Sequence, residues 1–276
     1  MRHLLVKERL LTLIIALIVA GGAPYATDVR TKIENYITIR TQPPEETQKV
    51  DPEKDTPTHI IVTLSCDTYY RGACVRIRSG PGTDYPVITR IRNGAVFEVG
   101  PPVYTQNTIW YPIMFNEWLR YPERAVGEWY ISGDFVTPYT DKTSSTIITN
   151  PSAKKIIIHR EEQMLYAYEN NTLVMREYVS TGIEQTPTPR GEFTVYRKTP
   201  SRYMQGPIPE ISEKYYDLPG VPWNLYFTEE GAVIHGAYWH DHFGTRWSNG
   251  CVNLPPEKAK LLYEWADTGT KVLVQD

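Results

Sequence analysis

The chain has 276 residues, which is long enough for two modest domains that each bury a core. Apolar residues make up 41% of it and charged residues 22%, proportions that indicate an ordinary soluble globular protein. The formal net charge is −3, and no basic run is long enough to indicate a nucleic-acid-binding protein.

Residues 1–26 have the pattern of an export signal. Three basic residues among the first nine precede an apolar run at 10–20. The run is shorter than the roughly 18 residues of a membrane-spanning helix and suits the core of a signal peptide. Pro24 makes both candidate cleavage sites poor, so an uncleaved N-terminal membrane anchor stays open as the alternative. In either case we predict that the protein acts outside the cytoplasm.

Residues 27–58 are predicted to be a linker, because their second half is rich in Pro, Glu, Thr and Lys and poor in large apolar groups. Residues 59–139 bunch β-forming residues between turn residues, which predicts a small β domain. Asn93-Gly94 predicts a hairpin within it. Cys66 and Cys74 are candidates for a disulfide in an exported protein, but spacing alone does not give their geometry, so two reduced thiols remain the alternative.

A connector at 140–152, rich in Ser and Thr, leads to a predicted mainly β domain at 153–276. Tyr203 to Pro222 is expected to be a proline-rich loop with little regular structure, suited to capping a groove. A helix is predicted at about 255–266, with two prolines at its start and Gly269 after its end. Strands are predicted at 154–160, 163–169, 172–182, 192–198, 221–228, 232–236 and 270–275.

One stretch, 234–253, combines a histidine at a predicted strand end with a small polar turn that ends on a thiol, Ser248-Asn249-Gly250-Cys251. A cysteine nucleophile needs a nearby base, since only the thiolate attacks. Gly250 allows a sharp turn and lets a substrate carbonyl approach backbone N–H groups that suit an oxyanion. The following helix is expected to favour the thiolate through its N-terminus.

These residues resemble the signature of the L,D-transpeptidases, cysteine enzymes that cross-link peptidoglycan stem peptides. His235-Gly236 and Ser248-Asn249-Gly250-Cys251-Val252-Asn253 fill the fixed positions of that signature in order. The resemblance covers about 154–275, including Ser-Thr-Gly at 180–182 and Thr-Pro-Thr-Pro-Arg-Gly-Glu-Phe at 186–193. It implies a β-sandwich-like catalytic domain with a short C-terminal helix, 3→3 cross-linking through a cysteine thioester, and neither cofactor nor metal.

The resemblance also implies roles for individual residues. Cys251 would be the nucleophile and His235 the base, although the residue pattern alone does not choose among His235, His240 and His242. Asn249 stands where many family members have His or Arg, which puts an ionic role there in doubt. The residues expected to support the turn or the oxyanion are Gly250, Ser248, Asn249, Gly236 and Asn253; those expected to contact substrate are Tyr203, Trp223, Tyr238 and Arg190.

The β domain at 59–139 resembles bacterial Src-homology-three-like domains, small β-barrels found in wall enzymes. The resemblance rests on Val75 to Ile88, on Asn-Gly-Ala-Val-Phe-Glu-Val at 93–99, and on Gly-Glu-Trp-Tyr-Ile-Ser at 127–132. An insertion, Tyr104 to Arg124, departs from the short family pattern. The resemblance implies wall attachment or positioning, with a passive spacer as the alternative.

Several functional alternatives remain on sequence grounds. His235, His240, His242 and Cys251 have the residue types of a zinc site, but their spacing matches no common zinc signature. The same catalytic pair with water as acceptor would give an L,D-carboxypeptidase, and with a protein amine an enzyme that anchors proteins to peptidoglycan. A non-catalytic wall-binding protein is the third alternative. We expect a monomer whose partners are peptidoglycan stem peptides in the cell wall or an equivalent extracytoplasmic space.

Overall fold

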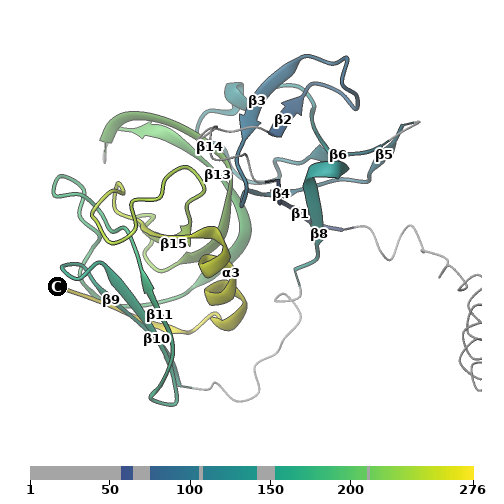
Figure 1. Ribbon diagram of the computed structural model, residues 1–276. Coiled ribbons are helices and arrows are strands. Elements are labelled where there is room, and N and C mark those ends of the chain that lie inside the picture. Colours follow the sequence, from purple (N-terminus) through teal and green to yellow (C-terminus); the bar gives the residue numbers. More distant parts are fainter. Residues whose placement is uncertain (1–56, 65–74, 106–107, 142–152, 210–211) are drawn as a thin grey trace, which may run out of the picture. The chain divides into compact units, whose positions relative to one another are not determined.

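The structure is a computed structural model, and its described residues are mainly β with one α-helix (Figure 1). They belong to one compact unit, Thr56–Asp276. No helix in this described part is long and apolar enough to cross a membrane. The described residues are 57–64, 75–105, 108–141, 153–209 and 212–276.

Four sequence predictions lie outside the described residues wholly or largely. They are the export signal or anchor at 1–26, most of the linker at 27–58, most of the connector at 140–152, and the Cys66–Cys74 pair. These stay predictions.

The segment 59–139 forms two antiparallel sheets. Alternate residues of its strands point into a common core that includes Ile60, Ile77 and Ile131, all fully buried. The described residues do not close into the small barrel that the sequence predicted. The three-stranded sheet has the order β4-β1-β8 and the five-stranded sheet the order β3-β2-β7-β6-β5. The elements are β1 (His59–Val62), β2 (Val75–Arg78), β3 (Val87–Ile91), β4 (Val96–Glu98), β5 (Val103–Tyr104), β6 (Ile109–Ile113), β7 (Trp129–Ser132) and β8 (Val136–Tyr139), with short 3-10 helices η1 (Pro122–Ala125) and η2 (Gly133–Phe135).

The hairpin predicted at Asn93-Gly94 is wrong. The strands on either side, β3 and β4, belong to different sheets and do not pair. Gly94 still turns the chain, with a φ of +89° that favours glycine. Its N–H donates to the Val62 carbonyl at 2.9 Å, so the turn passes the chain to the sheet of β1 instead of folding it back on β3.

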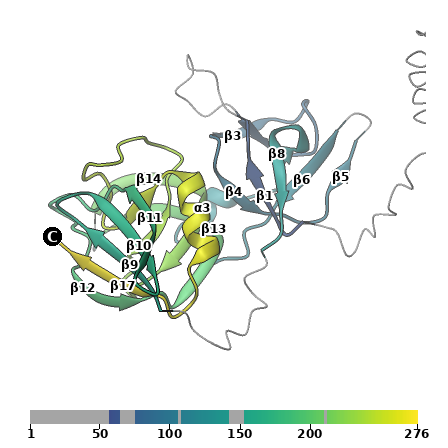
Figure 2. The ribbon, with the colours of Figure 1, turned by 60° about the horizontal axis from the view of Figure 1, so that its bottom comes forward.

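The segment 153–276 also contains two sheets. The first has the order β11-β10-β9-β17-β12, whose strands Figure 2 shows in succession, and the second the order β13-β14-β15-β16. The strands predicted at 154–160, 163–169, 172–182, 232–236 and 270–275 agree with these elements within a few residues. The strand predicted at 192–198 is divided between β12 and β13, and the one predicted at 221–228 is the end of the longer strand β14. Their bounds are β9 (Lys154–His159), β10 (Met164–Glu169), β11 (Thr172–Tyr178), β12 (Gly191–Thr194), β13 (Arg197–Ile208), β14 (Ser212–Tyr226), β15 (Val233–Gly236), β16 (Val252–Leu254) and β17 (Lys271–Gln275).

The predicted helix is confirmed as α3 (Pro256–Trp265), with proline at its first position. Proline suits this position because the N–H that it lacks would have no partner inside the helix. Ala259, Leu262 and Tyr263 are buried on the face that packs against β14 and β15. The helix therefore covers the strand that carries His235.

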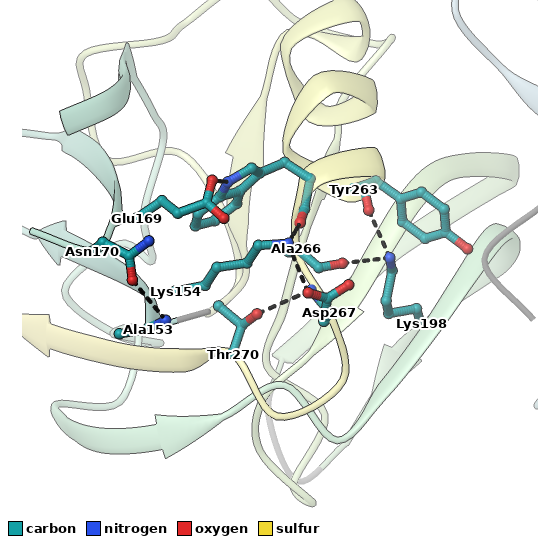
Figure 3. A network of polar contacts seen from close by, with 10 residues as sticks. Ala153, Lys154, Glu169, Asn170, Lys198, Tyr263, Ala266, Asp267 and Thr270 are labelled. Carbon is teal, nitrogen blue, oxygen red and sulfur yellow. Dashed lines mark hydrogen bonds and ion pairs between the residues drawn. The ribbon is translucent and has the colours of Figure 1, made fainter. Parts of the chain in front are cut away.

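Two lysines bind the C-terminal end of α3 (Figure 3). Lys198 Nζ donates to the carbonyls of Tyr263 (2.7 Å) and Ala266 (2.5 Å), while Lys154 Nζ donates to the Trp265 carbonyl at 2.7 Å. The last carbonyls of a helix have no intrahelical donor and carry partial negative charge, so cations there satisfy and stabilise them. These contacts hold α3 in place behind β15.

The loop predicted from Tyr203 to Pro222 is wrong, since this segment lies in the long hairpin β13–β14. Prolines normally argue against strands because they remove a ladder donor. Here β13 is an edge strand, and the pairing shifts register between Arg202 and Met204 and again between Gly206 and Ile208. Such irregularities and edge positions are where strands tolerate proline.

Candidate active site

His235 and Cys251 come together through a parallel strand pair that the sequence did not predict. β16 pairs with β15 in the register Ile234 to Val252 and His235 to Asn253, and Cys251 directly precedes β16. Because side chains alternate between faces along a strand, this register points Cys251 and Asn253 to the same side as His235. His235 and Cys251 both line one cavity of about 280 Å³.

His235 is buried, at 2% exposure, at the end of β15. Its Nδ1 lies 3.0 Å from the Gly236 carbonyl oxygen. A carbonyl only accepts, so Nδ1 carries the proton and donates, which leaves Nε2 as the basic nitrogen. The pKa of His235 is lowered to about 4, chiefly by burial and to a smaller extent by Arg202 and His240, while the hydrogen bond to the Gly236 carbonyl acts in the opposite direction. The imidazole is therefore neutral at neutral pH and able to accept a proton.

Cys251 is a half-buried free thiol whose Sγ lies 4.0 Å from the Gly231 carbonyl oxygen. Burial raises the pKa of Cys251, and the Val233 backbone and the Arg202 charge only partly offset this effect. The expected help from a helix N-terminus is not found, because β16 separates Cys251 from α3. The resting pair is thus a neutral thiol and a neutral imidazole, with no ion pair between them.

The turn before Cys251 is braced by hydroxyl groups. Ser248 Oγ donates to the Cys251 carbonyl (2.5 Å) and accepts from the Gly250 N–H (3.1 Å). Thr188 Oγ1 also donates to the Cys251 carbonyl, at 3.3 Å. Gly250 has a φ of +109°, a conformation that side-chain-bearing residues rarely adopt. Its N–H is already bonded to Ser248, so Gly250 shapes the turn through its backbone conformation.

The two motifs upstream pack directly beneath this turn. The N–H of Gly182 donates to Thr188 Oγ1 at 2.9 Å, and Ser180 exchanges both backbone hydrogen bonds with Asn253 (2.9 and 3.0 Å). A Cβ at position 182 would lie 2.1 Å from the Thr186 carbonyl oxygen, so glycine is required there. The motifs therefore fix the backbone on both sides of Cys251.

The other predicted supporting residues take different places. Asn249 and Asn253 line the cavity. Asn253 Nδ2 lies 2.9 Å from His240 Nε2, and its Oδ1 is buried without a hydrogen-bond partner among the described residues. Gly236 allows close packing of the chain, because a Cβ at this position would lie 2.8 Å from the Pro222 ring.

Of the four residues predicted to contact substrate, Tyr203 lines the cavity, with its hydroxyl 3.2 Å from Asp217 Oδ2. Trp223 lies in the core at 2% exposure and packs against the tilted ring of Tyr263. The Tyr238 hydroxyl donates to the Pro219 carbonyl at 2.5 Å, and Arg190 pairs with Asp276 at 2.8 Å. These last three do not line the cavity.

Apart from Tyr203, the lining residues from the hairpin β13–β14 and from the segment between β6 and β7 were not predicted from the sequence. Arg202, Lys214 and Tyr216 reach the cavity from the hairpin β13–β14, and Trp118 and Arg120 reach it from the segment between β6 and β7. Trp118 and Arg120 belong to the insertion from Tyr104 to Arg124, and this departure from the short domain pattern was the feature of the sequence that could have indicated a role for them. Trp239 and Trp247 complete the lining beside the turn.

His235, His240, His242 and Cys251 do not gather as ligands. Within the described ranges, no group of three or more His, Cys, Asp or Glu side chains is placed to hold a metal ion. His240 and His242 instead take part in an aromatic cluster with Trp247, with His242 and Trp247 ring centroids 3.9 Å apart.

Residues 153–274 match the model of the L,D-transpeptidase catalytic domain (YkuD). The chain is also similar to "Putative L,D-transpeptidase YqjB" of Bacillus subtilis (strain 168), with 25% identity over 135 residues that cover 46% of this chain and 73% of the relative. Among solved structures, an Enterococcus faecium L,D-transpeptidase mutant is 27% identical with a TM-score of 0.41, over 45% of this chain and 50% of that one. A Mycobacterium smegmatis L,D-transpeptidase is 20% identical with a TM-score of 0.43, over 64% of this chain and 93% of that one. The match thus spans about half the length of the Enterococcus structure.

Proposed function

We propose that the chain is an exported L,D-transpeptidase that forms 3→3 cross-links between peptidoglycan stem peptides, with Cys251 as nucleophile and His235 as base. The observation that carries the proposal is that these two side chains line one cavity while the Gly236 carbonyl directs the imidazole. The match of residues 153–274 to the catalytic-domain model supports the reaction class.

In the first half-reaction His235 Nε2 takes the proton of the Cys251 thiol as Sγ attacks the carbonyl that precedes the terminal D-Ala of a tetrapeptide donor. The neutral states of both groups at rest fit this general-base route. The developing oxyanion faces backbone N–H groups at the turn, whose geometry Ser248 and Thr188 hold. The imidazolium then gives its proton to the leaving amine, which releases D-Ala and leaves a thioester.

In the second half-reaction the side-chain amine of an acceptor stem attacks the thioester. His235 takes a proton from that amine, the C–S bond breaks, and the proton returns to the sulfur. By the family resemblance the diamino acid of the stem is meso-diaminopimelate.

The acceptor distinguishes the alternatives. Water in place of the amine gives an L,D-carboxypeptidase, and a protein amine gives an anchoring enzyme. Mass spectrometry of muropeptide products separates a cross-linked dimer from a tripeptide and from a protein adduct.

The segment 59–139 would attach or position the enzyme in the wall, in keeping with the resemblance of its sequence to bacterial Src-homology-three-like domains.

The central test is intact-mass analysis of the full-length chain after incubation with a tetrapeptide stem. We expect a mass gain equal to the acyl fragment in the wild type and none in Cys251→Ala. The matched control is the double variant Cys66→Ser/Cys74→Ser, which keeps Cys251 as the sole cysteine and should still be acylated. Cross-linking by a folded Cys251→Ala variant would overturn the mechanism.

A further inference from the structure

Three cationic side chains and no carboxylate are among the described residues that line the cavity of Cys251. Arg120, Arg202 and Lys214 line it, and none of its described lining residues is Asp or Glu. Neither Arg120 nor Arg202 makes an ion pair within the described part of the chain. A cavity with walls of one charge sign concentrates ligands of the opposite sign, so this one suits an anionic ligand.

Part of this charge comes from outside the segment that matches the catalytic-domain model. Trp118 and Arg120 lie between β6 and β7, in the segment 114–125, which we call the β6–β7 segment. The matched residues begin only at 153. The predicted wall domain therefore contributes directly to the cavity of the candidate active site.

The β6–β7 segment is fixed along the edge strand β13 by paired hydrogen bonds. The Tyr121 N–H donates to Gln205 Oε1, and Gln205 Nε2 donates back to the Tyr121 carbonyl, both at 2.9 Å. The Tyr121 hydroxyl donates to the Pro207 carbonyl at 2.8 Å, and Glu117 Oε1 accepts from the Tyr203 N–H at 2.6 Å. The residues between these anchors, 118–120, are thus held in a defined place at the cavity.

Trp118 and Arg120, which lie between the fixed residues Glu117 and Tyr121, have side chains that commonly bind ligands. Trp118 is 76% exposed, and the Arg120 guanidinium carbon lies 5.6 Å from the centroid of its ring. Arg120, Arg202 and Tyr216 line the same cavity. Burial raises the pKa of Tyr216 to about 12, and both arginines oppose this rise. Exposed tryptophan and arginine are typical binding anchors.

We propose that Arg120, with Trp118 beside it and Arg202 in the lining of the same cavity, binds the carboxylate that ends the donor peptide. The inference rests on the proposed function, because that reaction breaks the bond one residue before this carboxylate. Consecutive Cα atoms are only about 3.8 Å apart, so the carboxylate of a bound donor must lie within the cavity that holds Cys251. A guanidinium matches a carboxylate with two parallel hydrogen bonds.

The test compares two donors that differ only in the terminal charge, a tetrapeptide stem ending in D-alanine and the same stem ending in D-alaninamide. The variants are Arg120→Ala and Arg120→Gln in the full-length chain. The matched control is Arg76→Ala, which removes the same charge from an exposed position on β2 away from the cavity. Acylation of Cys251 is followed by intact mass to give kcat/KM for each donor.

We expect the wild type and Arg76→Ala to prefer the acid, and both Arg120 variants to lose about tenfold or more of kcat/KM for the acid alone. An unchanged preference in folded Arg120 variants would overturn the inference while leaving the proposed function standing.

A second readout separates failure of the inference from failure of the proposed function. If the wild type is acylated by neither donor, the proposed function fails, and both peptides are used as ligands that protect Cys251 from iodoacetamide. Protection by the acid but not by the amide, lost in Arg120→Ala and kept in Arg76→Ala, would sustain carboxylate binding at Arg120. Equal protection by both peptides in all three proteins would overturn it.

Discussion

The two walls of the cavity are built in different ways. The wall that carries Cys251 and His235 is formed by β15 and β16, whose residues are all buried, and by a turn braced by Ser248 and Thr188. The opposite wall is formed by an edge strand with register shifts and by the β6–β7 segment, and its tryptophan is largely exposed. The first wall is built mainly on buried strands, whereas the second combines buried residues of β13, such as Tyr203, with the exposed Trp118.

In the proposed reaction, this difference separates two tasks. Bond breaking requires the reacting atoms to be placed to within a fraction of an ångström, which buried strands and fixed turns provide. Recognition of a charged peptide end needs the right charge at the right side of the cavity, and long side chains on an edge provide it. Changes on the first wall should therefore act mainly on kcat, and changes on the second mainly on KM.

The largest effect is expected from His235→Asn on the buried wall. Without the base, the rate of Cys251 acylation should fall by about 100- to 10,000-fold, while KM for the donor changes little. Single-turnover kinetics with the tetrapeptide stem measures this. The matched control is His159→Asn, because His159 lies on β9 and does not line the cavity. A comparable loss in the control, or a small one in His235→Asn, would contradict the assignment of the base.

The pH dependence of the wild type tests the same wall without a substitution. Burial lowers the pKa of His235 to about 4, and the imidazole works as a base only when it is unprotonated. Donor acylation should therefore stay level from neutral pH to about 5 and fall about tenfold per pH unit below 4. Because burial also raises the pKa of Cys251, alkylation by iodoacetamide should keep increasing beyond the usual titration range of a thiol.

A resting thiolate–imidazolium pair would behave in the opposite way. It would give fast alkylation by iodoacetamide already at pH 5, where a neutral thiol reacts slowly. Tryptophan fluorescence at each pH serves as the control, since loss of the fold at low pH would also lower the rate.

The contrast between the walls also explains what could be predicted from the sequence. The turn from Ser248 to Cys251 could be predicted from the sequence, because small polar residues and a glycine favour a tight turn and the thiol that follows is a potential nucleophile. The helix at 256–265 was predictable from the prolines at its start and from Gly269 after its end. β16 was missed because three residues carry too little pattern to identify a strand.

The second wall, which comes from β13, β14 and the β6–β7 segment, was only partly predictable from the sequence. The prolines of β13 and β14 argue against strands in general, and only the edge position and the register shifts, which depend on tertiary pairing, make them compatible. Trp223 seemed a substrate contact because large aromatic side chains serve both binding and packing. Its burial against Tyr263 is a property of the fold that no local pattern contains.

The smallest effect is expected from Arg124→Ala, which loosens the second wall without touching its ligand-binding side chains. Arg124 Nη1 donates to the Gly206 carbonyl at 2.8 Å and lies 3.7 Å from Asp217 Oδ1. The guanidinium carbon of Arg124 lies 4.0 Å from the centroid of the Tyr121 ring. Its loss should let the β6–β7 segment move, raising KM for the acid donor about three- to tenfold with little change in kcat, as for one or two lost hydrogen bonds. Steady-state kinetics measures the split, and Arg90→Ala, an exposed arginine on β3, is the matched control. A fall in kcat at unchanged KM would mean that the two walls are not separate in function, because the second wall would then be positioning the reacting groups.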